Sequence, residues 1–300
     1  MQKSAVIDLG TNTFHLLIVA PSESDTFLEL CRERIFVKLA EEGIERIGAA
    51  PFERGLAAMR RFKTILDEQE VKQLKAFGTA ALRTASNAGL FIQRIKEETN
   101  IEVAIIDGDE EALLIYQGVR QVVNFGVEKG LIMDIGGGSV EFILANQNGV
   151  IWAQSFPIGV AVLTRKFHQE DPISETAITA LHHFLDNILQ PLHEILRQHN
   201  VDNLIGASGT FDVLEATLVK PTKKVLSSSF PTHHFAPLYK RLIHTSLEER
   251  FQMSDIPDSR AELIITALIL IQYIIDLTKT PEIIVSSYAL KEGAIAQFNR

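Results

Sequence analysis

The sequence predicts an α/β protein built from two similar units. Strand-like segments alternate along the chain with segments whose apolar residues recur at helical spacing. A hairpin pattern occurs twice, at residues 5–20 and 131–145, and a length of 300 residues is sufficient for two domains of ordinary size. We place the boundary so that the units are residues 1–124 and 125–300, with a C-terminal helix that can pack back on the first unit.

Composition narrows the class of protein. A hydrophobic fraction of 46% and a charged fraction of 22% are typical of a folded globular chain, and a net charge of −9 argues against a nucleic-acid partner bound through bulk charge. The single cysteine, Cys31, excludes a disulfide within the chain and a zinc site of several cysteines. No signal-peptide pattern is present, and the most apolar run, residues 263–275, is too short to span a bilayer. We therefore expect a cytoplasmic protein that does not enter a membrane.

The second hairpin carries the strongest chemical signal. An apolar run at residues 131–133 leads into Asp134 at the end of the predicted strand. The turn that follows consists of small residues, Gly136, Gly137, Gly138 and Ser139. Glycines let backbone N–H groups approach an anion closely, and a carboxylate beside that anion can hold a hard cation. The motif taken alone is equally compatible with a simple turn and with a phosphate and metal site.

The first hairpin repeats this pattern without a gap. At one fixed offset the matched pairs are Asp8 with Asp134, Gly10 with Gly136, Thr13 with Ser139, and His15 with Glu141. Such a repeat indicates one supersecondary unit used twice. Two hairpins of this kind could clamp a phosphate chain from both sides.

The rest of the first unit contains two further candidates. After a strand at residues 27–39 and a helix beginning at Pro51, a loop at residues 79–87 carries Arg83 among small residues. That arginine either lies on the surface or forks onto an anion. A strand at residues 101–106 precedes a helix with Glu110 and Glu111 in its first turn. These acids complement the helix dipole, or one of them is a general base, and residue patterns by themselves favour the dipole.

The second unit continues with a strand at residues 150–159 and a long amphipathic helix at residues 173–198. A strand at residues 201–206 runs into a helix opened by Gly206, Ser208, Gly209 and Thr210, which can cap the helix or face an anion. A basic loop at residues 220–224 is expected to be solvated. An apolar helix starts at residues 257–260, where Arg260 is a candidate ligand of an anion, and a strand at residues 282–287 and a final helix close the chain.

Several motifs in this order resemble the exopolyphosphatase / guanosine pentaphosphate phosphohydrolase family, in its short two-domain form. VIDLGTNTFHLLI and LIMDIGGGSVE are similar to its two phosphate loops, FGTAALRTASN to its arginine loop, and IIDGDEEALLIYQGV to the segment of its catalytic glutamate. The resemblance covers essentially the whole chain. It implies two ribonuclease H-like domains of the actin-like ATPase superfamily with an interdomain cleft.

The resemblance also implies a role for each candidate. Glu111 falls on the general base, while Asp134 and Glu141 fall on acidic positions that hold Mg²⁺ or another divalent cation. Positions expected to bind substrate phosphate are Thr11, Asn12, Thr13, Arg83, Gly136, Gly137, Gly138, Ser139, Ser208, Gly209 and Arg260. The sequence departs from the family at His15 and Lys291, where the family usually has arginine, and loss of the fixed charge at His15 could weaken binding of a long polyanion.

The implied activity is metal-dependent hydrolysis of the terminal phosphoanhydride bonds of inorganic polyphosphate, with release of orthophosphate. Hydrolysis of guanosine pentaphosphate at its 5′ phosphate, or of short polyphosphates, is the alternative within the family. Outside it stand a sensor that binds polyphosphate or a nucleotide without turnover, and a sugar kinase or ATPase of the same superfamily. Longer family members carry additional helical domains after this point, so a grip on long chains would be absent or supplied by a homodimer partner.

Overall fold

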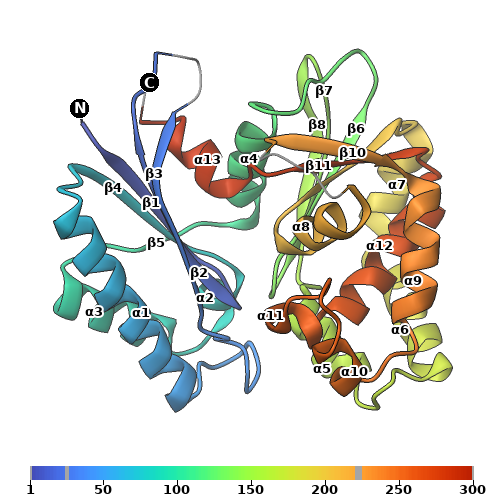
Figure 1. The fold of residues 1–300 in the computed structure, drawn as a ribbon, viewed down its shortest axis with the longest axis horizontal. Coiled ribbons are helices and arrows are strands. Elements are labelled where there is room, and N and C mark those ends of the chain that lie inside the picture. Colours follow the sequence, from blue (N-terminus) through green and yellow to red (C-terminus); the bar gives the residue numbers. More distant parts are fainter. Residues whose placement is uncertain (1, 24–26, 220–224, 299–300) are drawn as a thin grey trace. The chain divides into compact units, whose positions relative to one another are not determined.

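The computed structural model describes residues 2–23, 27–219 and 225–298, which form two compact units (Figure 1). Unit 1 comprises Met1–Gln121, Gly136–Gly138 and Ala289–Arg300, and unit 2 comprises Val122–Ile135 and Ser139–Tyr288. The expected basic loop at residues 220–224 lies outside the described residues. No described helix has both the length and the apolarity needed to cross a membrane.

Unit 1 is built on a five-stranded sheet in the order β3-β2-β1-β4-β5. The predicted hairpin and the predicted strand after it form a three-stranded meander, because β2 pairs antiparallel with both β1 and β3. β4 and β5 then extend the sheet in parallel. The strands are β1 (Ser4–Leu9), β2 (Thr13–Ala20), β3 (Leu28–Phe36), β4 (Gln73–Gly78) and β5 (Ala104–Ile105).

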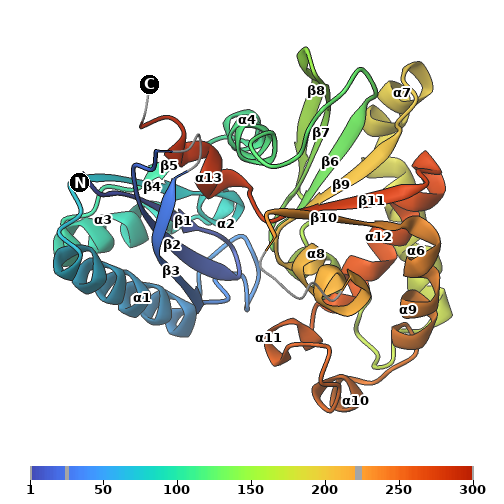
Figure 2. The same cartoon turned by 45° about the horizontal axis from the view of Figure 1, so that its top comes forward.

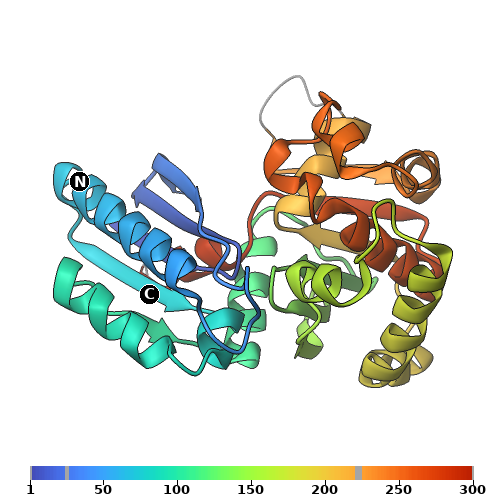
Figure 3. The same ribbon diagram turned by 90° about the horizontal axis from the view of Figure 1, so that it is seen from below.

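In the described part of unit 1 there are five helices: α1 (Ala49–Glu68), α2 (Ala80–Thr84), α3 (Ala88–Thr99), α4 (Gly108–Val119) and α13 (Leu290–Ile295). Figure 3 shows α1 and α3 side by side, and they pack against each other. Successive side chains of a strand alternate between faces, so Ile7, Leu16 and Ile18 contribute to one core with the apolar stripes of these two helices. The C-terminal α13 contacts α4 and β1, which places the end of the chain in unit 1.

Unit 2 is built on a six-stranded sheet in the order β10-β11-β9-β6-β7-β8, which Figure 2 shows from one edge strand to the other. β6, β7 and β8 form an antiparallel meander, and β9 and β11 extend it in parallel. The strands are β6 (Gly130–Ile135), β7 (Val140–Asn146), β8 (Gly149–Phe156), β9 (Asn203–Ala207), β10 (Ser227–Pro231) and β11 (Glu282–Ser286). β10 has the sequence SSSFP, which carries no strand signal, and only its antiparallel pairing with β11 makes it one.

The helices of unit 2 surround an extensive apolar core centred on α12, in which ten residues are buried. They are α5 (Val160–Phe167), α6 (Glu175–Ile188), α7 (Gln190–Gln198), α8 (Gly209–Leu214), α9 (Phe235–Leu242), α10 (Leu247–Phe251), α11 (Asp258–Ala261) and α12 (Ile264–Thr278). A π-helix, Glu215–Val219, follows α8, and a 3₁₀-helix, Thr232–His234, precedes α9. The expected apolar helix at residues 263–275 is therefore a core helix.

Three elements differ from the sequence prediction. The loop expected at residues 79–87 contains the short helix α2. The single helix expected at residues 173–198 is divided at Leu189, because Pro191 lacks an N–H and its ring opposes continuation of the preceding turn. The helix expected to start at residues 257–260 is also two helices, α11 and α12, which are separated at Leu263.

The two sheets repeat one topology. In each unit the first three strands form a meander, and two further strands continue the sheet in parallel beside the first strand. These are β4 and β5 in unit 1 and β9 and β11 in unit 2, where β10 is added at the edge. The matched positions of the two hairpins also share their register, since Asp8 pairs with His15 and Asp134 pairs with Glu141. The predicted fold class, an α/β protein of two similar units, is confirmed, since each unit contains one mixed sheet.

Candidate functional site

In unit 1, an arginine and a glutamate form an ion pair between two helices. Arg83 on α2 donates from Nη1 to Glu111 Oε2 on α4 at 2.6 Å, and also to the carbonyl oxygen of Ile106 at 3.0 Å. The Glu111 side chain is 9% exposed and that of Arg83 is 20% exposed. Arg83 Nη2 and Nε make no hydrogen bond to any residue that the structure describes. This guanidinium can therefore donate to a further group while Nη1 remains bound to Glu111.

The start of α4 decides which of the two acids faces inward. Asp107 caps the helix by accepting a hydrogen bond from the backbone N–H of Glu110 at 2.8 Å. Glu110 is then exposed, whereas Glu111, one residue further round the helix, is buried. Sequence patterns alone favoured dipole complementation for both acids. The burial and pairing of Glu111 separate it from Glu110, which has the surface position expected for such a role.

The loop between β1 and β2 is fixed by backbone hydrogen bonds. The N–H groups of Val37 and Lys38 donate to the carbonyl oxygen of Asn12, and that of Leu39 donates to Thr11. Thr11 is buried, and so is Thr13, which begins β2. These contacts immobilise the loop that was expected to bind phosphate.

Asp8 precedes this loop and keeps some exposure to solvent. Burial raises the pKa of its carboxyl; the charge of Lys291 opposes this shift, and that of Glu292 adds to it. All three side chains belong to unit 1. The first carboxylate of the repeated motif therefore has surroundings that favour its protonated form.

In unit 2, two carboxylates lie opposite each other on neighbouring strands. Asp134 of β6 is the register partner of Glu141 of β7, and both are buried. Glu141 in turn pairs with Ser155 of β8, whose Oγ donates to Glu141 Oε1 at 2.6 Å. Directly paired residues point to the same face of a sheet. The turn Gly136–Gly138 and Ser139 connect the two carboxylate strands, and contacts group this turn with unit 1.

These two carboxylates fit a magnesium ion better than a metal with many protein ligands. Within the described part of the chain, no three His, Cys, Asp or Glu side chains gather in a way that could hold a metal. Mg²⁺ commonly keeps several waters and takes one or two carboxylates together with phosphate oxygens of a substrate. Asp134 and Glu141 provide such a set. Ser155 was missed by sequence reasoning, although its place opposite Glu141 in a hairpin meander was a usable signal.

Unit 2 also contains a candidate arginine, Arg260, which lies directly over a glycine. A Cβ atom built on Gly209, the first residue of α8, would lie 1.6 Å from Arg260 Nη2 of α11. Ser208 has φ 70° and ψ 174°, a backbone conformation that is essentially confined to glycine and costs about 1–3 kcal/mol in other residues. Such strain is concentrated at functional sites. The structure thus brings Arg260 to Gly209, which lies far from it in the sequence and directly follows Ser208.

The geometry can be compared with known proteins. The model of the Ppx/GppA phosphatase family matches residues 18–298. The chain belongs to this family. A crystal structure of an exopolyphosphatase from Cytophaga hutchinsonii is similar, with 38% sequence identity, coverage of 99% of this chain and 97% of that chain, and a TM-score of 0.94. The Aquifex aeolicus Ppx-GppA enzyme has the same fold at 24% identity, with 99% of each chain covered and a TM-score of 0.80.

Membership in this family makes the chain a phosphatase-family protein with a phosphate substrate. The predicted resemblance is therefore confirmed.

Proposed function

We propose that this protein hydrolyses the terminal phosphoanhydride bond of inorganic polyphosphate and releases orthophosphate. The observation that carries the proposal is the buried ion pair between Arg83 and Glu111, at 2.6 Å, in a chain of a phosphatase family. A module that only binds a polyanion gains nothing from a buried carboxylate, which repels its ligand. The similarity to an exopolyphosphatase at 38% identity supports polyphosphate as the substrate.

In the proposed reaction, Glu111 is the general base. Its carboxylate accepts a proton from the attacking water while Arg83, bound to the same carboxylate, fixes the position of the base. The remaining donors of Arg83 are suited to oxygens of the transferred phosphoryl group, on which negative charge is spread in the transition state. Attack at the terminal phosphorus breaks its bond to the bridging oxygen and releases orthophosphate.

The other proposed substrate contacts come from each unit separately. Unit 1 provides Thr11, Asn12, Thr13 and the turn of Gly136, Gly137 and Gly138, while unit 2 provides Ser139, Ser208, Gly209 and Arg260. Asp134 and Glu141 are proposed to hold a divalent cation such as Mg²⁺, which when bound neutralises phosphate charge. Ser155 fixes the orientation of the Glu141 carboxylate.

The test is phosphate release with Mg²⁺ from polyphosphates of defined length and from guanosine pentaphosphate. We expect wild-type protein to release orthophosphate from polyphosphate, and Glu111→Gln to lower kcat by about 10²- to 10⁴-fold, since general base catalysis contributes that much. Glu110→Gln is the matched control, because this exposed neighbour should leave kcat unchanged. Absence of phosphate release from every substrate would refute the hydrolase proposal.

Two other outcomes would revise it. Full activity of Glu111→Gln would remove that residue from the role of base. A higher kcat/KM with guanosine pentaphosphate than with any polyphosphate would assign the nucleotide as substrate.

A further inference from the structure

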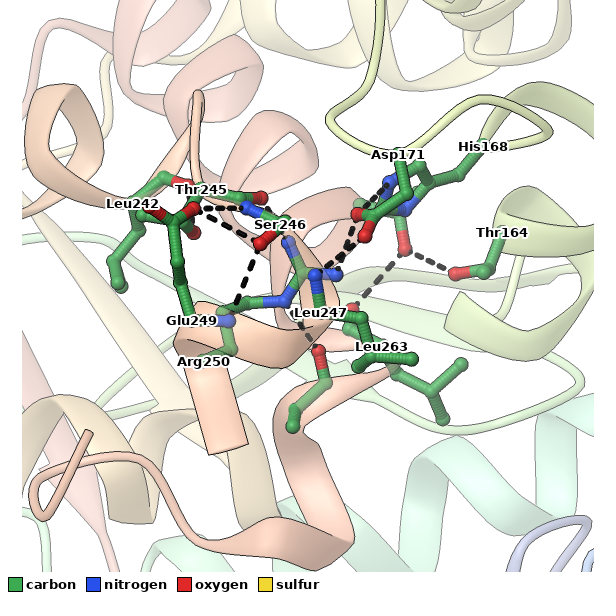
Figure 4. Close-up of polar contacts among 12 residues, drawn as sticks. Thr164, His168, Asp171, Leu242, Thr245, Ser246, Leu247, Glu249, Arg250 and Leu263 are labelled. Carbon is green, nitrogen blue, oxygen red and sulfur yellow. Dashed lines mark hydrogen bonds and ion pairs between the residues drawn. The ribbon is translucent and has the colours of Figure 1, made fainter. Parts of the chain in front are cut away.

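An arginine outside the set of proposed phosphate ligands is almost completely buried in unit 2. Arg250 on α10 has a side chain that is 1% exposed. Its Nε donates to the carbonyl oxygen of Ala261 at 2.8 Å, its Nη1 donates to that of Thr245, and its Nη2 donates to Asp171 Oδ1 at 3.1 Å. Figure 4 shows the guanidinium in the middle of these contacts. A buried charge is strongly unfavourable unless it is paired and hydrogen-bonded, so loss of any one of these partners would destabilise the whole set of contacts.

The negative partner of this arginine is also fixed. Asp171 Oδ2 accepts a hydrogen bond from the backbone N–H of Leu247 (Figure 4). Although burial raises the pKa of the Asp171 carboxyl, the Leu247 N–H and the charge of Arg250 outweigh it, and the net shift is downward. His168 Nε2 lies 3.5 Å from Asp171 Oδ1, and burial together with the charge of Arg250 lowers the pKa of this imidazole. A neutral His168 leaves the Asp171 charge to Arg250.

The helix that carries Arg250 has a well-defined start. Ser246 and Glu249 form a reciprocal capping box, in which the Ser246 N–H donates to Glu249 Oε2 at 2.7 Å and the Glu249 N–H donates to Ser246 Oγ at 3.2 Å (Figure 4). Such a cap stabilises a short helix. The capped start stabilises α10, and Arg250 on this helix can therefore stabilise a second segment through its hydrogen bonds.

That other segment is α11, which has little stability of its own. It spans four residues, and its N-cap residue, Pro257, provides no side-chain cap. Helices this short do not persist without tertiary contacts, and their last carbonyl groups need external donors. Arg250 provides one of these donors, to Ala261, the last residue of α11.

The residue before Ala261 is Arg260, whose guanidinium lies over Gly209. The contact leaves no space for even a methyl group at position 209, so a small movement of α11 would carry Arg260 off the start of α8. The path from Asp171 through Arg250 to the backbone of α11 consists of hydrogen bonds that lie entirely within unit 2.

We propose that Arg250 and Asp171 are positioning residues that brace α11 and so place Arg260 for phosphate binding. The phosphate role of Arg260 rests on the proposed function. The placement of its guanidinium does not, and it can be measured without turnover.

The test begins with the Nε–H resonance of Arg260 in protein labelled with ¹⁵N-arginine, which is assigned by its disappearance in Arg260→Lys. We expect Arg250→Lys and Asp171→Asn each to shift this resonance and to accelerate its exchange with water. Asp171→Asn keeps an oxygen for the Leu247 N–H, so it remains informative where Arg250→Lys folds poorly. Arg197→Lys, a change at an exposed arginine of the same unit, is the matched control. An Arg260 resonance that Asp171→Asn leaves unchanged would overturn the proposal.

Kinetics with tripolyphosphate give the second part of the test. Asp171→Asn should raise KM about tenfold and change kcat less than threefold, because misplacement of a binding group weakens its interaction. In an Arg260→Lys background the same substitution should have no further effect on KM, since both changes act through one contact. An equal increase of KM in both backgrounds would show that the brace does not act through Arg260. Wild-type protein without phosphatase activity would refute the proposed function, while the resonance would still decide the brace.

Discussion

The two repeated hairpins have the same register but opposite chemistry. Across β1, β2 and β3 of unit 1, Asp8 pairs with His15, which pairs with Arg34, whereas the same row in unit 2 is Asp134, Glu141 and Ser155. The unit 1 row sets one carboxylate beside two basic side chains, and burial favours its protonated form. The unit 2 row sets two buried carboxylates side by side. One backbone motif thus supports one row with two basic side chains and another with two paired carboxylates.

The helices that follow the fourth strand of each topology differ in a related way. In unit 1, α2 begins at Ala80 and carries its own arginine, Arg83, which is paired with Glu111. In unit 2, α8 begins at Gly209, and the arginine beside it comes from α11. The Arg260 guanidinium extends from α11 over the first residue of α8, where a Cβ atom would occupy the same space. This overlap explains a glycine where unit 1 has alanine.

Among tests of this comparison between the two hairpins, the largest effect is expected from breaking the pair of carboxylates in unit 2. Asp134→Asn and Glu141→Gln should each reduce activity at a fixed low Mg²⁺ concentration by about 100-fold, because loss of metal-site groups weakens affinity strongly. Activity should return partly at high Mg²⁺, which a titration of phosphate release against Mg²⁺ would measure.

The position equivalent to Glu141 in unit 1 provides the control. His15→Gln should leave the Mg²⁺ concentration at half-maximal activity unchanged, since His15 belongs to the row without paired carboxylates. Equal Mg²⁺ requirements in wild-type protein and Glu141→Gln would contradict the assignment of the cation to unit 2.

An intermediate effect is expected at the start of α8. Gly209→Ala should displace the Arg260 guanidinium, because the added Cβ would lie 1.6 Å from Nη2, and KM for tripolyphosphate should rise about tenfold. Gly89→Ala in α3 is the matched control, since no atom lies within 4 Å of a Cβ at that position. Unchanged KM in Gly209→Ala would mean that Arg260 does not contribute to substrate binding.

The smallest effect is a change in stability at Asp8. Because the pKa of Asp8 is raised in the folded state, the native protein binds this proton more tightly than the unfolded chain, and stability falls as pH rises from about 3.8 through the folded pKa. Asp8→Asn carries no charge at any pH. Relative to wild type, it should gain stability at pH 7.5 and lose that gain near pH 3.5.

Urea unfolding of both proteins at the two pH values measures this difference. If Asp8→Asn raised the free energy of unfolding equally at both pH values, or lowered it at pH 7.5, burial of the charged Asp8 carboxylate would not be destabilising.

Local sequence patterns are sufficient to predict the two repeated hairpins and the family. Alternation of apolar residues fixes which face of a strand is buried, and glycines fix where it turns, so Asp134 and Glu141 were predictable as neighbours. The cap at Asp107 likewise fixes Glu111 in the first turn of α4. These features depend on residues close together in the chain.

The contacts of the arginines depend on how distant segments of the chain pack. Arg83 reaches Glu111 over 28 residues of sequence, Arg260 lies on Gly209, and Arg250 braces α11 while bound to Asp171, 79 residues away. No local periodicity encodes such pairs, because they depend on how helices pack once their apolar faces are buried. The division of the expected helices at Leu189 and Leu263 and the strand β10 were decided by the same packing.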